Sequence, residues 1–491
     1  MNTVIDTRNR GGQKPPQASG EHQQLYKKRD PIYPKKISGP FRTIKWALLL
    51  ITLTIYYVTP WIRWQRPAPA PDQAVLVDFV HGRFYFFALH LWPDEVYFIT
   101  GLLVISALGL FLVTSLFGRL WCGYACPQTV WTDLYIFVER IFEGDRNARL
   151  KLNSPGWSLN KAFRKLGKHI VWLVIAMATG GAWIFYFHDA PELAQDFFTG
   201  KAATSAYIFF AVLTFTTYSL AGTMREQVCV FMCPWPRIQG AMIDSHTLQV
   251  AYRYDRGEPR GAHKKGDTWE GRGDCIDCNQ CVVVCPMGID IRNGLQLECI
   301  NCGLCIDACD EIMKKVERPK GLIAYDTIEA VAQRAKGQKG RYMLLRGRTV
   351  YYTIALALVG GVMVWGFLTR PLVTLHSVRD RNPLFVTLQD GSVRDGYLLT
   401  IANRTFETKT FKLNLQGVKP VAMYAPGVGD SVKDLAITVA PDETRDVKIF
   451  VTVKPETLAG PATPAVFTLT DRDGMVYQGK TVFDAPQETG R

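Results

Sequence analysis

Cysteine is absent from the first 121 residues of this 491-residue chain and from every position after Cys309. The twelve cysteines in between occur in clusters, which is the spacing of metal ligands or redox groups and not of a disulfide framework. Charge is also absent from several long stretches, although the formal net charge is +13. These gaps exclude a purely soluble globule, and an aromatic content of 12% excludes a disordered chain.

Five nearly uncharged stretches are each long enough to cross a lipid bilayer as a helix. They contain roughly 17–23 residues each, which at about 1.5 Å per residue span a hydrocarbon core of about 30 Å. We expect the first helix to begin near Phe41, with the Lys45 side chain reaching back to the membrane surface. The stretches are 46–62, 96–117, 170–187, 202–224 and 349–369.

The distribution of Lys and Arg between these stretches predicts the orientation in the membrane. Residues 1–45, 119–168 and 225–348 carry 10, 9 and 19 of them, 38 together, against 4 in the two alternate loops. The positive-inside rule then places the N-terminus in the cytoplasm, and five crossings place residues 370–491 in the periplasm. We therefore expect a multi-pass protein of the bacterial cell inner membrane, with all twelve cysteines in cytoplasmic segments.

The C-terminal segment, 370–491, has the sequence pattern of a β-domain. Short stretches such as Arg445–Val453 alternate polar and apolar residues, and Asp-Gly, Pro-Asp and Gly-Pro turns separate them. About seven such strands predict an all-β, immunoglobulin-like sandwich. The segment contains no catalytic constellation, so we expect it to serve as a docking or spacer module.

Eight cysteines between residues 275 and 309 repeat the run C-x₂-C-x₂-C-x₃-C, the second copy starting 24 residues after the first. In each run, three thiolates hold three corners of a [4Fe–4S] cube while the fourth ligates the other cube. Structural zinc would leave the third and fourth cysteine of each run without a role. We assign Cys275, Cys278, Cys281 and Cys309 to one cluster, and Cys285, Cys299, Cys302 and Cys305 to the other.

Two further cysteine pairs each begin five residues after a hydrophobic stretch, the second and the fourth. Both have the spacing C-x₃-C-P, so a hairpin followed by a cysteine pair occurs twice in the chain. In a local helix the two thiols of a pair lie on one face, and the proline then turns the chain away. The pairs are Cys122 with Cys126 and Cys229 with Cys233.

These four thiols predict a metal site at the cytoplasmic edge of the membrane, and copper is one of the metals that suit it. Soft thiolates suit Cu(I), zinc or a further cluster, and Met232 offers a thioether beside the second pair. Two alternatives stay open. The thiols pack as small hydrophobic groups, or each pair cycles between dithiol and disulfide.

The predicted fold is multi-domain: a five-helix transmembrane bundle, a cytoplasmic bacterial-type 2[4Fe–4S] ferredoxin domain and the β-sandwich. The domains are a polar tail (1–40), a four-helix membrane region (41–224) with a cytoplasmic loop (119–168), a cytoplasmic segment (225–348) containing the ferredoxin domain (about 265–320), a fifth helix (349–369) and the sandwich (370–491).

The motifs resemble those of a known family, the cytochrome c oxidase accessory proteins called CcoG, FixG or RdxA. The resemblance covers almost the whole chain and is most specific in Gly118-Arg-Leu-Trp-Cys-Gly-Tyr-Ala-Cys-Pro-Gln-Thr-Val130 and in Glu143-Gly-Asp-Arg146. It implies a membrane iron–sulfur protein needed to assemble a cbb3-type oxidase, with an immunoglobulin-like C-terminal domain. It also implies reduction of Cu(II) to Cu(I) before copper reaches the oxidase.

On this basis we expect an electron-transport protein with cupric reductase activity, although no residue is assigned as catalytic. Electrons pass from an unidentified donor through two [4Fe–4S] clusters to copper, and the expected partners are oxidase assembly factors or a copper chaperone or transporter. No nucleic acid partner is expected, because the positive charge lies in loops that face anionic lipid. Two other functions stay open: a quinol dehydrogenase-type membrane subunit, and a non-enzymatic assembly scaffold.

Overall fold

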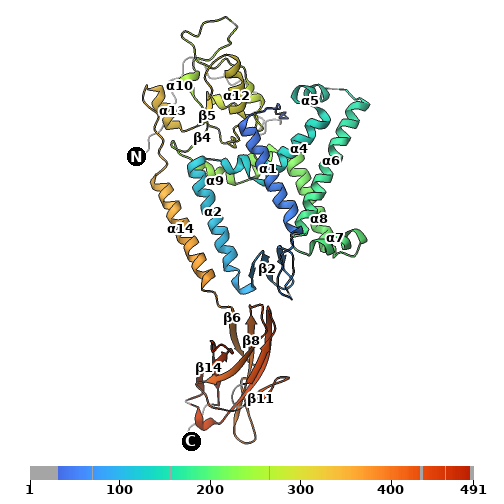
Figure 1. Cartoon of the computed structure of the whole chain (residues 1–491), viewed down its shortest axis with the longest axis vertical. Helices are drawn as coiled ribbons and strands as arrows, with labels where there is room; N and C mark the ends of the chain where they lie inside the picture. The colour runs from blue at the N-terminus through green and yellow to red at the C-terminus, as the bar shows by residue number, and fades with distance from the viewer. Residues whose placement is uncertain are drawn as a thin grey trace, which may run out of the picture.

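The protein is described here by a computed structural model. Its two globular parts lie at opposite ends of a set of long helices (Figure 1). The cysteine-rich part, with α10, α12 and α13, lies at one end, and the C-terminal β-domain lies at the other. The described residues are 31–486, except 69, 155, 265, 432–434 and 459, so most of the predicted N-terminal tail lies outside them.

Five helices in the described part of the chain are long and apolar enough to cross a membrane, which confirms the predicted number. Their ends differ from the apolar stretches because polar turns extend them, most clearly in α6. The fourth helix continues into a π-helical segment, η3, just before the second cysteine pair. The helices are α1 (Pro40–Val58), α2 (Tyr97–Phe117), α6 (Leu159–Ile184), α8 (Thr204–Thr217) with η3 (Tyr218–Met224), and α14 (Gly347–Leu368).

The helices pack mainly in two groups, α2 with α14 and α6 with α8, with α1 beside α6 (Figure 1). Glycines bring the partners of each group close together. A side chain at Gly101 of α2 would collide with Met363 of α14, and one at Gly180 of α6 would lie 3.0 Å from the carbonyl oxygen of Phe210 in α8.

The start of α1 is buried by the cysteine-rich part of the protein. The prediction that the Lys45 side chain reaches back to the membrane surface is wrong. This side chain is only 4% exposed, and its Nζ lies 3.6 Å from Asp133. Arg42 donates to both oxygens of the same carboxylate, at 2.8 and 3.0 Å. Hydropathy alone does not distinguish this pairing from snorkelling.

A three-stranded antiparallel sheet connects α1 to α2 at the end that faces the β-domain. Residues 84–92, an apolar run too short to span a membrane, form most of two of its strands. The 3₁₀ turn η2 (Pro93–Glu95) then leads into α2, and α7 (Ala190–Thr199) lies at the same end of the helices. The strands are β1 (Val75–Asp78), β2 (Arg83–Phe86) and β3 (Leu89–Leu91).

At the other end, short helices and a two-stranded sheet surround the cysteines. The sheet contributes Val250 and Ile323 to an apolar core that also contains Met313 of α12. The elements are α3 (Leu120–Tyr124), α4 (Pro127–Glu143), α5 (Arg146–Leu152), η4 (Val228–Met232), α9 (Trp235–Met242), β4 (Gln249–Tyr252), α10 (Tyr254–Gly257), α11 (Gln280–Val283), η5 (Ile291–Asn293), α12 (Leu304–Lys315), β5 (Ile323–Asp326) and α13 (Ile328–Ala335).

The C-terminal domain is a sandwich of two antiparallel sheets. One has the order β11-β10-β13-β8-β6, with β7 also on β8, and the other has the order β12-β9-β14-β15. Alternate residues of β12 are buried, as expected where one face of a sheet covers a core. The described residues of the sandwich form ten strands where about seven were predicted: β6 (Val373–Arg379), β7 (Val386–Thr387), β8 (Val393–Asn403), β9 (Lys409–Gln416), β10 (Pro420–Ala425), β11 (Gly429–Ser431), β12 (Leu435–Val439), β13 (Glu443–Val453), β14 (Ala462–Thr470) and β15 (Val476–Asp484).

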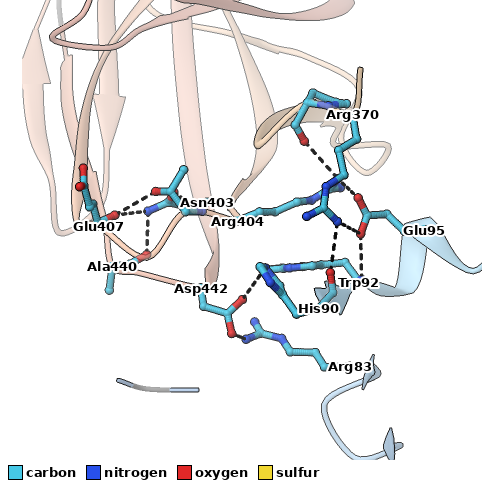
Figure 2. A network of polar contacts seen from close by, with 12 residues as sticks. Arg83, His90, Trp92, Glu95, Arg370, Asn403, Arg404, Glu407, Ala440 and Asp442 are labelled. Atoms are coloured by element: carbon cyan, nitrogen blue, oxygen red, sulfur yellow. Dashed lines mark hydrogen bonds and ion pairs between the residues drawn. The ribbon is translucent and has the colours of Figure 1, made fainter. Parts of the chain in front are cut away.

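Buried ionic contacts join the β-domain to the neighbouring ends of the helices (Figure 2). Arg404, which follows β8, contacts Asp94 and lies 2.9 Å from Glu95, whose side chain is 2% exposed. Asp442, between β12 and β13, pairs with Arg83 of β2 at 2.5 Å. Because leaving either partner of such a pair alone in a buried site is costly, these contacts fix the domain in place.

Candidate metal centre

The eight cysteines of the doubled motif surround two separate cavities. One is lined by Cys275, Cys278, Cys281 and Cys309, and we call it the outer cavity. The other is lined by Cys285, Cys299, Cys302 and Cys305 and also by Cys281, and we call it the inner cavity. All four thiols of each predicted set thus line one cavity, and which of them bind a cluster stays a prediction.

Helix α12 produces the crossover between the two runs. Cys305 and Cys309 lie one helical turn apart, so the helix presents one thiol to the inner cavity and the next to the outer cavity. The short helix α11 holds Cys281 between the cavities in the same way. Each cavity thus offers at least four thiols, enough for the donor set of a [4Fe–4S] cube.

The two cysteine loops have the same unusual backbone. Asp277 and Asn301, each two residues after the first cysteine of a run, have φ of 56° and 54°. Asn279 and Gly303, two residues further, have φ of 56° and 73°. Left-handed residues at matching positions curl each loop around its cavity, and such conformations persist where a site requires them.

Burial raises the pKa of most of these thiols, to about 12 for Cys281 and Cys309 and to about 11 for Cys299. Iron binds the thiolate, so the positive metal must offset the cost of deprotonating buried sulfur. Cys278 is exposed, which places the outer cavity near the surface.

The loop that follows Cys299 packs directly against the membrane edge of the helices. A Cβ at Gly123 of α3 would lie 2.5 Å from the carbonyl oxygen of Ile300 and 3.1 Å from the Cα of Cys302, so only glycine fits there. The Tyr124 hydroxyl donates to the carbonyl oxygen of Cys302 at 3.0 Å. The inner cavity therefore adjoins the first C-x₃-C-P segment.

The two C-x₃-C-P segments form a structural repeat as well as a sequence repeat. Gly118 and Arg225, each four residues before the first cysteine of a pair, break the preceding helix with φ of 60° and 45°. Cys126 and Cys233 are both extended, and a helix, α4 or α9, begins within two residues. The intervening turn is α-helical in the first copy and π-helical in the second.

Among the residues that the structure describes, no three His, Cys, Asp or Glu side chains are placed to hold a single metal ion. The structure therefore does not gather Cys122, Cys126, Cys229 and Cys233 into the compact arrangement of one tetrahedral ion. Copper at these thiols stays a prediction.

A buried ionic cluster, not anticipated from the sequence, supports the second cysteine pair. Glu139 of α4 lies 2.8 Å from Arg225 and also contacts Arg149, while Lys168 of α6 lies 2.7 Å from Glu143. Arg225 is thereby held in its left-handed conformation just before the pair. The Glu143-Gly-Asp-Arg146 motif was the available signal, since Glu143 and the helix that begins at Arg146 belong to this cluster.

These observations define a class. The protein has membrane-spanning helices, a ferredoxin-like part with two four-thiol cavities, and a β-sandwich at the opposite end. A family model described as "4Fe-4S dicluster domain" matches residues 224–328, and one described as "4Fe-4S binding domain" matches residues 99–143. A third, described as an IG-like fold at the C-terminal of FixG, matches residues 363–486.

Full-length relatives define the family. The chain is 48% identical over 459 residues to nitrogen fixation protein FixG of Rhizobium meliloti (strain 1021), covering 87% of each. It is 50% identical over 433 residues to protein RdxA of Cereibacter sphaeroides, covering 87% of this chain and 90% of that protein. RdxB of the same organism is 48% identical over 445 residues, covering 90% and 91%. The chain belongs to the FixG/RdxA family and is an iron–sulfur electron-transfer protein of the FixG type.

Proposed function

We propose that this protein is a cupric reductase that acts in the assembly of a cbb3-type cytochrome oxidase. The observation that carries the proposal is the contact between the inner cluster loop and the membrane edge, at Gly123 and Cys302. It gives electrons a route from an outer cluster through an inner cluster to the membrane surface. Clusters held by these thiols would supply one-electron transfer, which matches the one-electron reduction of Cu(II) to Cu(I), and an electron donor would have to replace each electron given to copper. The resulting Cu(I) favours soft ligands in its acceptor.

The cluster ligands are proposed from the cavities that they line. Cys275, Cys278, Cys281 and Cys309 hold the outer cluster, and Cys285, Cys299, Cys302 and Cys305 hold the inner one. The exposure of Cys278 supports electron entry at the outer cluster.

We also propose that the cluster domain lies in the cytoplasm and the β-domain in the periplasm of a bacterial inner membrane. The placement of these parts at opposite ends of five helices, together with the excess of Lys and Arg in segments on the cluster side, supports this orientation (Figure 1). The β-domain would then meet oxidase assembly factors or a copper chaperone or transporter.

Quinol oxidation is a second candidate, and one observation favours it. An apolar groove between α6 and α8, lined by residues such as Leu173 and Phe215, contains a hydrogen-bonded pair, His169 Nδ1 and the Tyr218 hydroxyl, 2.8 Å apart. A quinol head group needs such a proton acceptor beside an apolar surface. In that case quinol is the electron donor to the clusters.

The test is anaerobic stopped-flow mixing of the dithionite-reduced, desalted protein with Cu(II). We expect cluster absorbance to recover at the same rate as a Cu(I)–chelator signal rises, with one Cu(I) for each cluster reoxidised. Cluster reoxidation without Cu(I), or no reoxidation, would overturn the proposal. Mixing the oxidised protein with a quinol instead tests the second candidate, which predicts bleaching of the clusters.

A further inference from the structure

A cavity of about 500 Å³ lies where α6 ends and α8 begins, beside α7, at the end of the helices that faces the β-domain (Figure 1). It shares no lining residue with the groove that contains His169. Its volume lies within the range of about 300–1,000 Å³ that holds small molecules in proteins. Because it is bounded by the ends of two membrane-spanning helices, it lies at the level where a membrane protein meets lipid head groups.

Aromatic side chains from three parts of the chain line this cavity. Phe79, in the turn between β1 and β2, stacks on Phe187, with the ring centroids 5.5 Å apart. Trp183, in the last turn of α6, lies 5.7 Å from Phe187 between centroids, and Phe209 of α8 also lines the cavity. The faces of such rings attract ammonium groups, and aromatic residues at this depth pack against lipid.

Charged side chains of α7 and of the loop that follows it line the same cavity. Glu192 and Asp196 lie one helical turn apart on α7, and Lys201 precedes α8. In the part of the chain that the structure describes, none of these three side chains has an ion-pair partner, so their charges are available to a ligand. His188 and Ser205 add further hydrogen-bonding groups.

This lining fits a ligand that carries a cation, an anion and an apolar part. A primary ammonium donates several hydrogen bonds, which suits two carboxylates among aromatic rings, and a phosphate suits Lys201. A metal ion does not fit, since no three His, Cys, Asp or Glu side chains of the described residues are placed to hold one. An electron donor does not fit either, because the cysteine-rich part lies at the other end of the helices (Figure 1).

We propose that this cavity binds the head group of phosphatidylethanolamine from the membrane leaflet on the β-domain side. The ammonium group contacts Glu192 and Asp196, the phosphate contacts Lys201, and the acyl chains leave along the exposed apolar surface of α8. The bound lipid ties α7 and the turn that contains Phe79 to the ends of α6 and α8. This inference is independent of electron transfer.

Native mass spectrometry of the full-length protein tests the site. The protein is released from nanodiscs that contain equal amounts of phosphatidylethanolamine and phosphatidylglycerol with the same acyl chains, and loosely bound lipid is removed by collision. We expect one phosphatidylethanolamine to remain per chain, preferred by about tenfold or more, since one charge-assisted hydrogen bond contributes about this much. Equal retention of the two lipids would overturn the proposal.

Substitution locates the bound lipid. The double variant Glu192→Gln/Asp196→Asn should lose the preference, and Ser205→Trp should lose the lipid by filling the cavity while keeping its charges. Glu407→Gln is the matched control, since Glu407 is exposed near the same end of the helices but does not line the cavity (Figure 2). Cluster absorbance and the thermal unfolding midpoint establish that each variant is folded. Unchanged lipid binding in either folded cavity variant would contradict the site.

A soluble head group separates a lipid site from a site for a free amine. Glycerophosphoethanolamine has the same ammonium and phosphate groups but no acyl chains. We expect that it does not displace the bound lipid at equal concentration, because the chains contribute to binding. Displacement at equal concentration would overturn the lipid assignment and make the cavity a site for a soluble amine.

Discussion

Cys309 is the cysteine whose place in the sequence differs most clearly from its place in the structure. It belongs to the second cysteine run but lines the outer cavity with three thiols of the first run. We predict that Cys309→Ser damages the outer cluster and spares the inner one. EPR of the reduced variant should lose the outer signal and its coupling to the inner signal. Selective damage to the inner cluster would contradict the crossed assignment.

Gly123 is the residue that allows the inner cluster loop to touch the helices. Because a Cβ would lie 2.5 Å from the carbonyl oxygen of Ile300, Gly123→Ala should cost about 1–3 kcal/mol and push the loop away. We expect a lower thermal unfolding midpoint and slower cluster reoxidation by Cu(II).

Gly109→Ala is the control for this change, since nothing lies within 4 Å of a Cβ there. It should be neutral or stabilise α2 by up to about 1 kcal/mol. Equal effects of the two substitutions would contradict a contact role for Gly123.

Residue spacing alone predicts a grouping of the eight ferredoxin thiols, because the fourth cysteine of each run is too far along the chain for its own cube. The roles of Gly123 and Arg225 were not predictable in this way. Each depends on a partner more than 80 residues away, Ile300 for the glycine and Glu139 for the arginine.

At the scale of elements, the interface between β3 and the β-domain should respond to pH. Burial, and next the charge of Arg370, lower the pKa of His90 from its usual 6.5 to about 4. The unfolded chain therefore binds a proton between pH 6.5 and 4 that the folded chain does not, so stability is lost as the pH falls through this window.

We predict that the wild type loses about 1–3 kcal/mol more than His90→Gln between pH 6.5 and 4. Asp442 faces His90, and burial raises its pKa, which has the opposite effect. Because that contribution is common to both proteins, the difference in their unfolding midpoints isolates His90. Parallel pH profiles would contradict this assignment.

The five long helices were predictable from the sequence, because an uncharged apolar stretch of this length has few stable structures other than a membrane-spanning helix. Which of these helices pack against each other was not predictable, because hydropathy carries no information about the neighbours of a membrane-spanning helix. The strands β2 and β3 were missed for a related reason. Their apolar run, residues 84–92, is too short to span a membrane, and its pairing with β1 is what makes it part of a sheet.

At the scale of the whole molecule, the account requires that the two ends of the helices face opposite sides of the membrane. Thr408 of the β-domain and Ser154, after α5, are both exposed. A cysteine introduced at position 408 should react with a membrane-impermeant maleimide in intact spheroplasts, and one at position 154 should react only after lysis. Labelling of both positions, or of neither, before lysis would contradict five crossings.

The central claim is that this protein acts by electron transfer and not as a scaffold. The most direct measurement is cbb3-type oxidase activity in membranes of cells whose only copy carries Cys302→Ser, with immunoblotting to establish that the variant accumulates, and with Gly109→Ala cells as the control. The account predicts that oxidase activity is lost in the Cys302→Ser cells and normal in the control. Normal oxidase activity with an accumulated Cys302→Ser protein would contradict it, because the protein would then assist assembly without its inner cluster.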